Sequence, residues 1–516
     1  MFLFSANTVN FSIFDSQGNY ICCPVRLITS HHGNDKCVQP NNFYQTPVSF
    51  FSTQRRFYSI FLVILTLSAC QRAKFDNKRL EPLAQDPFVQ VYFNHSQSSE
   101  YLEPYRHQAH QGDDLEKLIV ETISQAKSTI DVAVQELRLP KIAQALVDKQ
   151  KAGIKVRVIL ENNYSRPWSS FTANEVNKLD KREQERYQEY RLFADSNKDG
   201  NLSQEEINQT DALVILKQAK IPLIDDTSDG SQGSSLMHHK FVIVDNRFVI
   251  VTSANFTMSD IHGDFKNTNS LGNANNLLKI DSPEIADLFT KEFNLMWGDG
   301  VEGKVDSKFG LQKPLQKSHQ FVLGDNQITV KFSPNSPTQP WNNSSNGLIG
   351  NTLNSANKSI DIALFVFSDQ RLANILEMRH KNNVKIRALI ERSFAYRPYS
   401  EALDMMGVAL STKCKNQVDN RPWENPITTV GVPILAKGDL LHHKFAVIDN
   451  KTVIAGSHNW TKAGNNSNDE TLLVIENPII AAHYLREFDR LYANSRLGIP
   501  PKIQQKIKTQ NKQCHQ

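Results

Sequence analysis

Two copies of one short pattern, H-x-K-x4-D, carry the side chains best suited to chemistry. Each copy is followed by a small-residue turn that holds a serine and an asparagine. The members are His238, Lys240, Asp245, Ser253 and Asn255 in the first copy, and His442, Lys444, Asp449, Ser457 and Asn459 in the second.

This combination of residue types suits a phosphodiester. A histidine and a lysine two residues apart on a strand share one face, so both can reach one ligand. A lysine ammonium and an asparagine amide can hold the non-bridging phosphate oxygens. If the two sets face each other, one imidazole can attack phosphorus and the other can protonate the leaving oxygen, which gives a covalent phosphohistidine. Because lysine and asparagine supply the electrostatic stabilisation, we expect no cofactor for catalysis.

The elements that must position these sets are themselves duplicated. Residues 126–133 resemble 357–363, and residues 154–157 resemble 384–387 at the same offset. Each half has a helix (114–126; 347–356), an apolar β-branched run (130–134; 360–366), a second helix and another buried strand (155–160; 385–390). This alternation predicts an α/β fold of two lobes, each with a mixed, mostly parallel sheet flanked by helices.

Two full copies of the pattern in one chain resemble the phospholipase D superfamily, and the resemblance covers residues 85–495. Thr252 departs from it, because it stands where the family usually has glycine. The resemblance implies a pseudo-twofold axis between the lobes, with both histidines around one phosphate. It also implies that Asp245 and Asp449 support the fold. The neighbours His239 and His443 should point to the opposite strand face and pack.

The halves differ at one position that bears on the mechanism. Glu470 in the second half aligns with Asn275 in the first, and the resemblance implies that the acidic residue orients a catalytic histidine. A carboxylate beside an imidazole favours its protonated form. We therefore expect Glu470 to pair with His442, the general acid, and the amide of Asn275 to leave His238 neutral and nucleophilic.

An insertion in the first half, at about residues 176–212, contains a match to the EF-hand calcium loop. Residues 176–193 would form the entering helix. The alternative is a solvated acidic loop. The expected Ca²⁺ ligands are Asp195, Asn197, Asp199, Asn201 and Glu206.

The N-terminal residues 1–69 read as a leader with a lipoprotein-type signal peptide. Two arginines precede the apolar run 57–69, and the end Leu67-Ser68-Ala69-Cys70 resembles a bacterial lipobox. A short buried helix or strand is the alternative. We expect an exported lipoprotein of the bacterial cell envelope, held at a membrane surface through a lipid on Cys70. The remaining domains would be a first lobe at 70–300, a linker at 301–320 and a second lobe at 321–516.

Composition narrows the function classes. Lys plus Arg is 58 and Asp plus Glu is 54, so the net charge of +4 is unlike that of a polybasic binder. Six cysteines exclude a disulfide scaffold. The leading expectation is a phospholipase D-type hydrolase of phospholipids; the alternatives are an exported endonuclease and a phosphatidyltransferase. We expect a monomer, because one chain holds both half-sites.

Overall fold

The computed structural model describes residues 13–14, 20–21, 79–417 and 419–514. The chain divides into two units, residues 1–77 and 78–516. In the first, the described residues form one antiparallel pair, β1 (Ile13–Phe14) with β2 (Tyr20–Ile21). The predicted signal peptide and Cys70 lie outside the described residues. Within the described part, no helix combines the length and apolar character needed to cross a bilayer.

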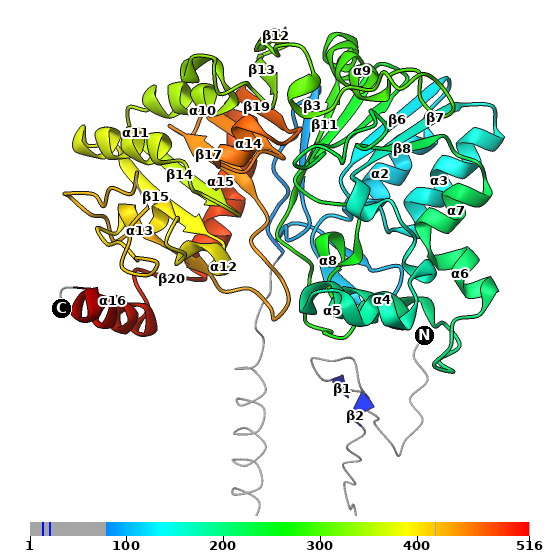
Figure 1. The fold of residues 1–516 in the computed structure, drawn as a ribbon, viewed down its shortest axis with the longest axis horizontal. Coiled ribbons are helices and arrows are strands. Elements are labelled where there is room, and N and C mark those ends of the chain that lie inside the picture. The colour runs from blue at the N-terminus through cyan, green and yellow to red at the C-terminus, as the bar shows by residue number, and fades with distance from the viewer. Residues whose placement is uncertain (1–12, 15–19, 22–78, 418, 515–516) are drawn as a thin grey trace, which may run out of the picture. The chain divides into compact units, whose positions relative to one another are not determined.

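The second unit contains two large sheets that repeat one strand order (Figure 1). The first runs β3 (Val89–Phe93), β11 (Asn276–Asp281), β10 (Phe248–Thr252), β9 (Lys240–Val244), β6 (Thr129–Val134), β7 (Lys155–Leu160) and β8 (Leu223–Asp225). The second runs β12 (His319–Leu323), β13 (Asn326–Phe332), β19 (Thr471–Glu476), β18 (Thr452–Gly456), β17 (Lys444–Ile448), β14 (Ser359–Leu364), β15 (Lys385–Ile390), β16 (Val430–Pro433) and β20 (Ser495–Leu497). Apart from β12 and β20 at its edges, the second sheet copies the first, which confirms the duplicated α/β lobes.

Both sheets are mixed, as expected, but the prediction that they are mostly parallel is wrong. Parallel pairing is confined to β6–β7–β8 and to β14–β15–β16. The other neighbouring strands pair antiparallel. Among them, β9–β10 and β17–β18 are tight hairpins. Their turns place Asp245, Asn246, Asp449 and Asn450 at φ of 49–55°, a region that Asp and Asn tolerate better than most residues.

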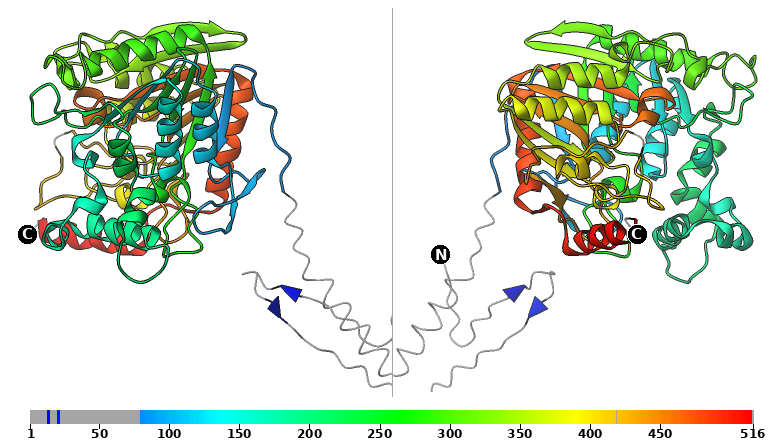
Figure 2. Two further views of the ribbon diagram at one scale, coloured as in Figure 1. Left: turned by 90° about the vertical axis from the view of Figure 1, so that its right-hand side faces the viewer. Right: turned by 60° about the vertical axis from the view of Figure 1, so that its left-hand side comes forward.

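Helices cover both faces of each sheet (Figure 2). The outer layers contain α2 (Leu115–Ser124), α3 (Pro140–Lys151) and α7 (Ala212–Gln218) in the first lobe, and α10 (Ser345–Asn354), α11 (Gln370–Lys381) and α13 (Glu401–Met405) in the second. The inner helices are α9 (Pro283–Trp297) and α15 (Pro478–Ala493), which start with proline behind the capping residues Ser282 and Asn477.

One hydrophobic core joins the lobes. Phe289 of α9 contacts Phe332 of the second lobe, and Tyr484 of α15 contacts Phe93 of the first, with ring centroids 5.1 and 5.2 Å apart. Burying each such side chain contributes roughly 1.5–3 kcal/mol. The lobes therefore pack as one body.

The insertion forms three short helices, α4 (Ala173–Lys178), α5 (Lys181–Ala194) and α6 (Gln204–Thr210). The predicted entering helix 176–193 is thus two helices. The reason is local: Leu179 is extended at ψ 155°, and the Asp180 side chain caps α5 by accepting from the Glu183 amide. Trp168, Tyr190 and Ala194 give the insertion a small core of its own.

The remaining elements complete the second unit. Most of the predicted linker 301–320 is exposed, but it is anchored at Lys313, whose ammonium is buried against Asp469 at 2.7 Å, and residues 319–320 already belong to β12. A disulfide joins Cys414 to Cys514 and ties down the C-terminal helix. The smaller elements are β4 (Glu100–Leu102), β5 (Ala109–Gln111), α8 (Met258–Ile261), α12 (Arg392–Ala395), α14 (Lys462–Asn466) and α16 (Pro501–Cys514).

Candidate active site

The two histidine patterns lie where the lobes meet. Lys240 begins β9 and Lys444 begins β17, and each histidine stands two residues before its strand. The backbone amide of His238 donates to the carbonyl of Asp469 at 2.9 Å, and that of His442 donates to Ala274 at 3.1 Å. His238 is therefore fixed to the segment that precedes β19 of the second lobe, and His442 to the segment that precedes β11 of the first, in a reciprocal arrangement.

This reciprocal contact overturns the expected pairing of Glu470. The Glu470 carboxylate lies 2.7 Å from Nδ1 of His238, across the lobe boundary. His442 Nδ1 lies instead 3.0 Å from the Oδ1 atom of Asn275. The expectation that Glu470 pairs with His442 was wrong because it assumed a partner within the same half, whereas the lobes exchange partners.

The two turn serines fix the orientation of these partners. Ser457 Oγ donates to Glu470 Oε2 at 2.7 Å, and Ser253 Oγ donates to Asn275 Oδ1 at 2.7 Å. The amide nitrogen of Asn275 donates to the Asp260 and Asn273 carbonyls. Its Oδ1 must therefore accept from His442 Nδ1, and Nε2 of each imidazole has no hydrogen-bond partner within the described part of the chain.

The departure at Thr252 is accommodated locally. The Thr252 hydroxyl donates to the Asn276 carbonyl at 2.5 Å and accepts from the Ala254 amide at 3.0 Å. Its counterpart Gly456 has φ 131°, and a Cβ there would lie 2.2 Å from the Thr471 carbonyl oxygen. The two turns thus hold Ser253 and Ser457 with different backbone conformations.

Both motif lysines are fully buried beside the histidines. Lys240 Nζ donates to the His238 carbonyl at 3.0 Å and to Gln135 Oε1 at 3.2 Å. Lys444 Nζ donates to the His442 carbonyl at 2.6 Å. Burial lowers the pKa of Lys240 to about 8, and burial with the neighbouring Lys240 charge lowers the pKa of Lys444 well below its usual value. An anion between the lysines would relieve both penalties.

A cavity of about 800 Å³ opens onto this group. Both histidines line it, as do Asn255 and Asn459, whose buried side-chain oxygens have no partner within the described residues. The amides of these asparagines can therefore turn toward a bound phosphate. The structure brings together, at one cavity, the two histidines and two asparagines that the sequence singled out.

Burial dominates the electrostatics of the histidines. It lowers the pKa of His238 to about 4, although the Glu470 carboxylate opposes this shift. The pKa of His442 falls well below its usual value through burial and the charge of Lys444. Burial alone would raise the pKa of Glu470, but His238 holds it at about 2. Burial thus favours the neutral form of both imidazoles, and the contact with His238 favours the ionised form of Glu470.

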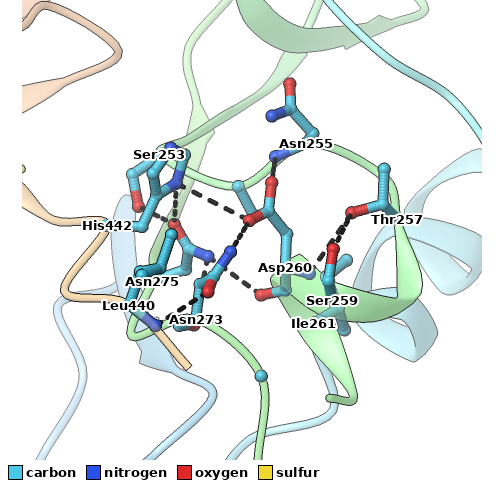
Figure 3. Close-up of polar contacts among 12 residues, drawn as sticks. Ser253, Asn255, Thr257, Ser259, Asp260, Ile261, Asn273, Asn275, Leu440 and His442 are labelled. Atoms are coloured by element: carbon cyan, nitrogen blue, oxygen red, sulfur yellow. Dashed lines mark hydrogen bonds and ion pairs between the residues drawn. The ribbon is translucent and has the colours of Figure 1, made fainter. Parts of the chain in front are cut away.

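The structure adds site residues that the sequence reasoning missed. Asp260 of α8 lies 3.8 Å from His442 Nδ1 and accepts from the Asn255 backbone amide at 2.8 Å (Figure 3). Gln135 and Phe365 follow equivalent strands, and the Phe365 ring lies 4.8 Å from that of His442. The repeat itself contained the signal for Gln135 and Phe365, since both directly follow the matched strands β6 and β14.

The other predicted supporting residues lie away from the cavity. Asp245 accepts from the backbone amides of residues 127–129, and Asp449 accepts from those of residues 357–359. His239 lies between Thr471 and Glu292, and His443 bonds Glu487 at 2.9 Å. These four side chains stabilise the strands that carry the motif.

The predicted calcium loop is closed by its own hydrogen bonds. Asp195 accepts from the backbone amides of Asp199 and Gly200, and Glu206 caps α6 through Ser203 while accepting from Ser196. Asn197 and Asp199 also accept from loop amides, and Asn201 stands at the position whose carbonyl would bind the ion. In the described part of the chain, no group of three or more His, Cys, Asp or Glu side chains is arranged to hold a metal.

Comparison with known proteins gives a family match over both lobes. A family model described as "Cardiolipin synthase, PLD-like domain" matches residues 119–297 and 349–492, more than half of the chain. Mitochondrial cardiolipin hydrolase of Xenopus laevis is 28% identical over 139 residues, which cover 27% of this chain and 56% of that protein. A phospholipase D of Rickettsia conorii is 26% identical over 140 residues, which cover 27% of this chain and 60% of that protein. The chain thus spans little more than half the length of these curated relatives.

Solved structures give a more distant likeness. Phosphatidylserine synthase of Haemophilus influenzae has a TM-score of 0.49 at 12% identity, covering 84% of this chain and 95% of that one. Nuc of Salmonella typhimurium, a phospholipase D family member, has a TM-score of 0.26 at 21% identity. The match covers 34% of this chain and 100% of that one.

Proposed function

Because the chain belongs to the phospholipase D superfamily of phosphodiesterases, we propose that it hydrolyses phospholipid phosphodiester bonds through a phosphohistidine intermediate. The observation that carries this proposal is the single cavity lined by His238, His442, Asn255 and Asn459, with each imidazole held by a residue of the other lobe. Two such sets around one phosphate supply a nucleophile, an acid and anion-binding groups.

His238 is the nucleophile in this proposal. Glu470 keeps a proton on its Nδ1 and leaves the Nε2 lone pair free to attack phosphorus. The attack makes the imidazole ring cationic, and the adjacent carboxylate neutralises that charge. The neutral amide of Asn275 could not do so for His442. The assignment of His238 thus agrees with the sequence hypothesis, but for the opposite reason.

His442 is the acid. Burial and the charge of Lys444 lower its pKa, and the negative charge of a bound phosphodiester would favour the protonated form that the first step needs. It protonates the leaving oxygen as the His238–phosphorus bond forms. It then takes a proton from water, whose oxygen attacks phosphorus and releases His238. Lys240, Lys444 and the two asparagines stabilise the phosphate oxygens in both steps without a cofactor.

Phospholipid is the proposed substrate because the curated relatives are named as a cardiolipin hydrolase and a phospholipase D. The second candidate is an endonuclease. This candidate is supported by the polar lining of the cavity. Among the described residues that line it, the side chains that are purely aliphatic or phenyl are those of Leu236, Phe365 and Leu440. Transfer of the phosphatidyl group to an alcohol in place of water would use the same two steps.

Attachment to the cell envelope is part of the proposal. Cys70 would carry the lipid anchor of an exported lipoprotein, and the Cys414–Cys514 disulfide supports an oxidising compartment. Both half-sites belong to one chain, which supports a monomer.

Calcium binding at the insertion is a separate proposal. It rests on the donor set of the loop and requires Glu206 to leave its capping bonds and turn toward Asp195. Titration calorimetry with Ca²⁺ tests it. We expect Glu206→Gln to abolish the heat of binding and Glu205→Gln, at the neighbouring exposed position, to keep it. Equal binding by both variants would contradict the proposed site.

The test of function offers the protein labelled phospholipid vesicles and labelled single-stranded DNA, in the presence of EDTA. We expect lipid turnover that His442→Ala abolishes and that His319→Ala, an exposed histidine of β12, leaves unchanged. DNA cleavage with the same response would establish the nuclease. Lipid turnover that survives in His442→Ala would contradict the proposed site.

A further inference from the structure

A second hollow, of about 1120 Å³, lies beside the catalytic cavity on the second lobe. It is formed by α12, β16, β20, the start of α16 and the loop that follows β16, and we call it the basic groove. Figure 1 shows α12, β20 and α16 together at one end of this lobe. Its exposed cationic side chains are Arg392, Arg397, Lys437, Arg496, Lys502 and Lys506.

None of these six cationic side chains forms an ion pair with a carboxylate in the described part of the chain. The groove also contains Glu391 and Asp439, but both are engaged by the protein. Glu391 accepts from the Ser393 and Leu441 backbone amides, and Asp439 accepts from the Leu271 amide. Burial further raises the pKa of Asp439 to about 7. The groove therefore presents a strongly positive surface, and residues 491–516 contain no acidic residue.

Apolar side chains accompany the charge. Ile434 and Leu497 line the groove and are 44% and 46% exposed. Ile499 and Ile503 are half-buried beside them. The groove's aromatic residue within the described part, Tyr396, is partly buried, and its hydroxyl donates to the Gly498 carbonyl, which ties the ring to the protein.

We propose that the basic groove docks the protein onto an anionic lipid surface. Lysine and arginine side chains around exposed aliphatic residues match a layer of anionic head groups above acyl chains. The inference deepens the proposed phospholipid activity and rests on it.

The position of the groove gives docking a consequence for the reaction. Lys437, Gly438 and Leu440 line both the groove and the catalytic cavity. Head groups bound at the groove are therefore adjacent to the entrance that leads to His238 and His442. Docking would raise the local concentration of substrate without contributing to the chemical step.

The test measures binding of the full chain to two kinds of vesicle, one of phosphatidylcholine alone and one that also contains phosphatidylglycerol. We expect preference for the anionic vesicles, weakened by salt. The double variant Lys502→Glu/Lys506→Glu should lower that preference about tenfold or more. The control Lys304→Glu/Lys317→Glu changes the net charge equally, at exposed positions in the segment between the lobes, and should keep it.

Two further readouts separate this proposal from the proposed function. Turnover of soluble bis(p-nitrophenyl) phosphate should be the same in all three proteins, which shows that the fold and the chemistry are intact. If the unchanged protein does not hydrolyse bis(p-nitrophenyl) phosphate, that result contradicts the proposed phosphodiesterase activity, and the vesicle-binding result still stands. Equal binding to both vesicles, or an equal loss in the control variant, would overturn the docking surface. Loss of single-stranded DNA binding with vesicle binding retained would assign the groove to nucleic acid.

Discussion

At the scale of single residues, the duplicated site is asymmetric. Equivalent positions hold Glu470 and Asn275, and each serves the histidine of the other lobe. One imidazole therefore has an ionised partner and the other a neutral one. This difference lets two otherwise similar histidines take different roles, as attacking group and proton donor.

Removing the charge of Glu470 tests this asymmetry. Glu470→Gln can still accept from His238 and Ser457 but cannot neutralise a cationic phosphohistidine. We expect kcat to fall roughly a hundredfold to a thousandfold, and Asn275→Ala, its counterpart, to cost about tenfold. Steady-state kinetics on a soluble phosphodiester measure both. A larger loss in Asn275→Ala would reverse the assigned roles.

The acid limb of the pH profile gives a second readout. His238 must be neutral to attack, and its pKa is lowered to about 4, so kcat/KM should fall only as the pH drops through about 4. The Glu470 carboxylate favours the protonated form of His238. Its removal in Glu470→Gln must therefore shift the acid limb to still lower pH. A shift toward higher pH would show that Glu470 acts on another group.

The residue types of the site, and their order, could be predicted from the sequence, because the H-x-K-x4-D pattern occurs twice in equivalent places. The partner of Glu470 could not. It depends on the segments around Ala274 and Asp469 crossing between lobes, and no local pattern encodes that crossing. Asp260 was missed for a similar reason, since the helix α8 brings it to His442 from outside the repeat motif.

At the scale of elements, the motif aspartates act on strand geometry. Asp245 and Asp449 sit in the hairpin turns of β9 and β17 and bind the backbone amides that lead into β6 and β14. Each therefore connects three strands that carry or flank the site. The strands β6, β7, β14 and β15 follow the apolar runs closely. The expectation of mostly parallel sheets was wrong because β9 and β17, which carry the motifs, lie antiparallel to β6 and β14.

Removal of one of these carboxylates should affect stability and not chemistry. In Asp245→Ala three backbone amides lose their acceptor, which costs about 1–3 kcal/mol. The melting temperature should fall, while kcat of the folded enzyme stays unchanged. The pKa of Asp245 is lowered by these bonds, so its contribution is complete above its unfolded value and is lost as the pH falls through the folded one. A large loss of kcat at full folding would make Asp245 part of the chemistry.

At the scale of the whole molecule, a shared hydrophobic core and reciprocal backbone bridges hold the lobes together. The site therefore exists only when both lobes are in place. The Cys414–Cys514 disulfide reaches outside this core and ties α16, a wall of the basic groove, to the second lobe. The amino-acid composition did not predict this disulfide, because a count of six cysteines does not indicate which of them are bonded to each other.

Breaking this link should loosen the C-terminal helix while sparing the active site. The bridge closes a loop with a sequence separation of 100, for which loop entropy gives roughly 4–5 kcal/mol and measured cases are usually about 2–4 kcal/mol. We expect Cys414→Ser/Cys514→Ser to lower the unfolding free energy by an amount in this range, with turnover of a soluble substrate retained. Denaturant unfolding measures the change. No difference from the oxidised parent would show that the bridge does not constrain the unfolded chain.

Trapping the covalent intermediate tests the central claim most directly. The substrate carries a label on the phosphatidyl group and p-nitrophenol as the leaving group, which departs without an acid. The reaction is quenched within a single turnover in the unchanged protein and in His442→Asn, in which the second step is slowed so that the intermediate accumulates. We predict the label on the peptide that contains His238, and none in His238→Asn. Label on the His442 peptide would reverse the roles, and product formation without any labelled peptide would contradict a covalent phosphohistidine.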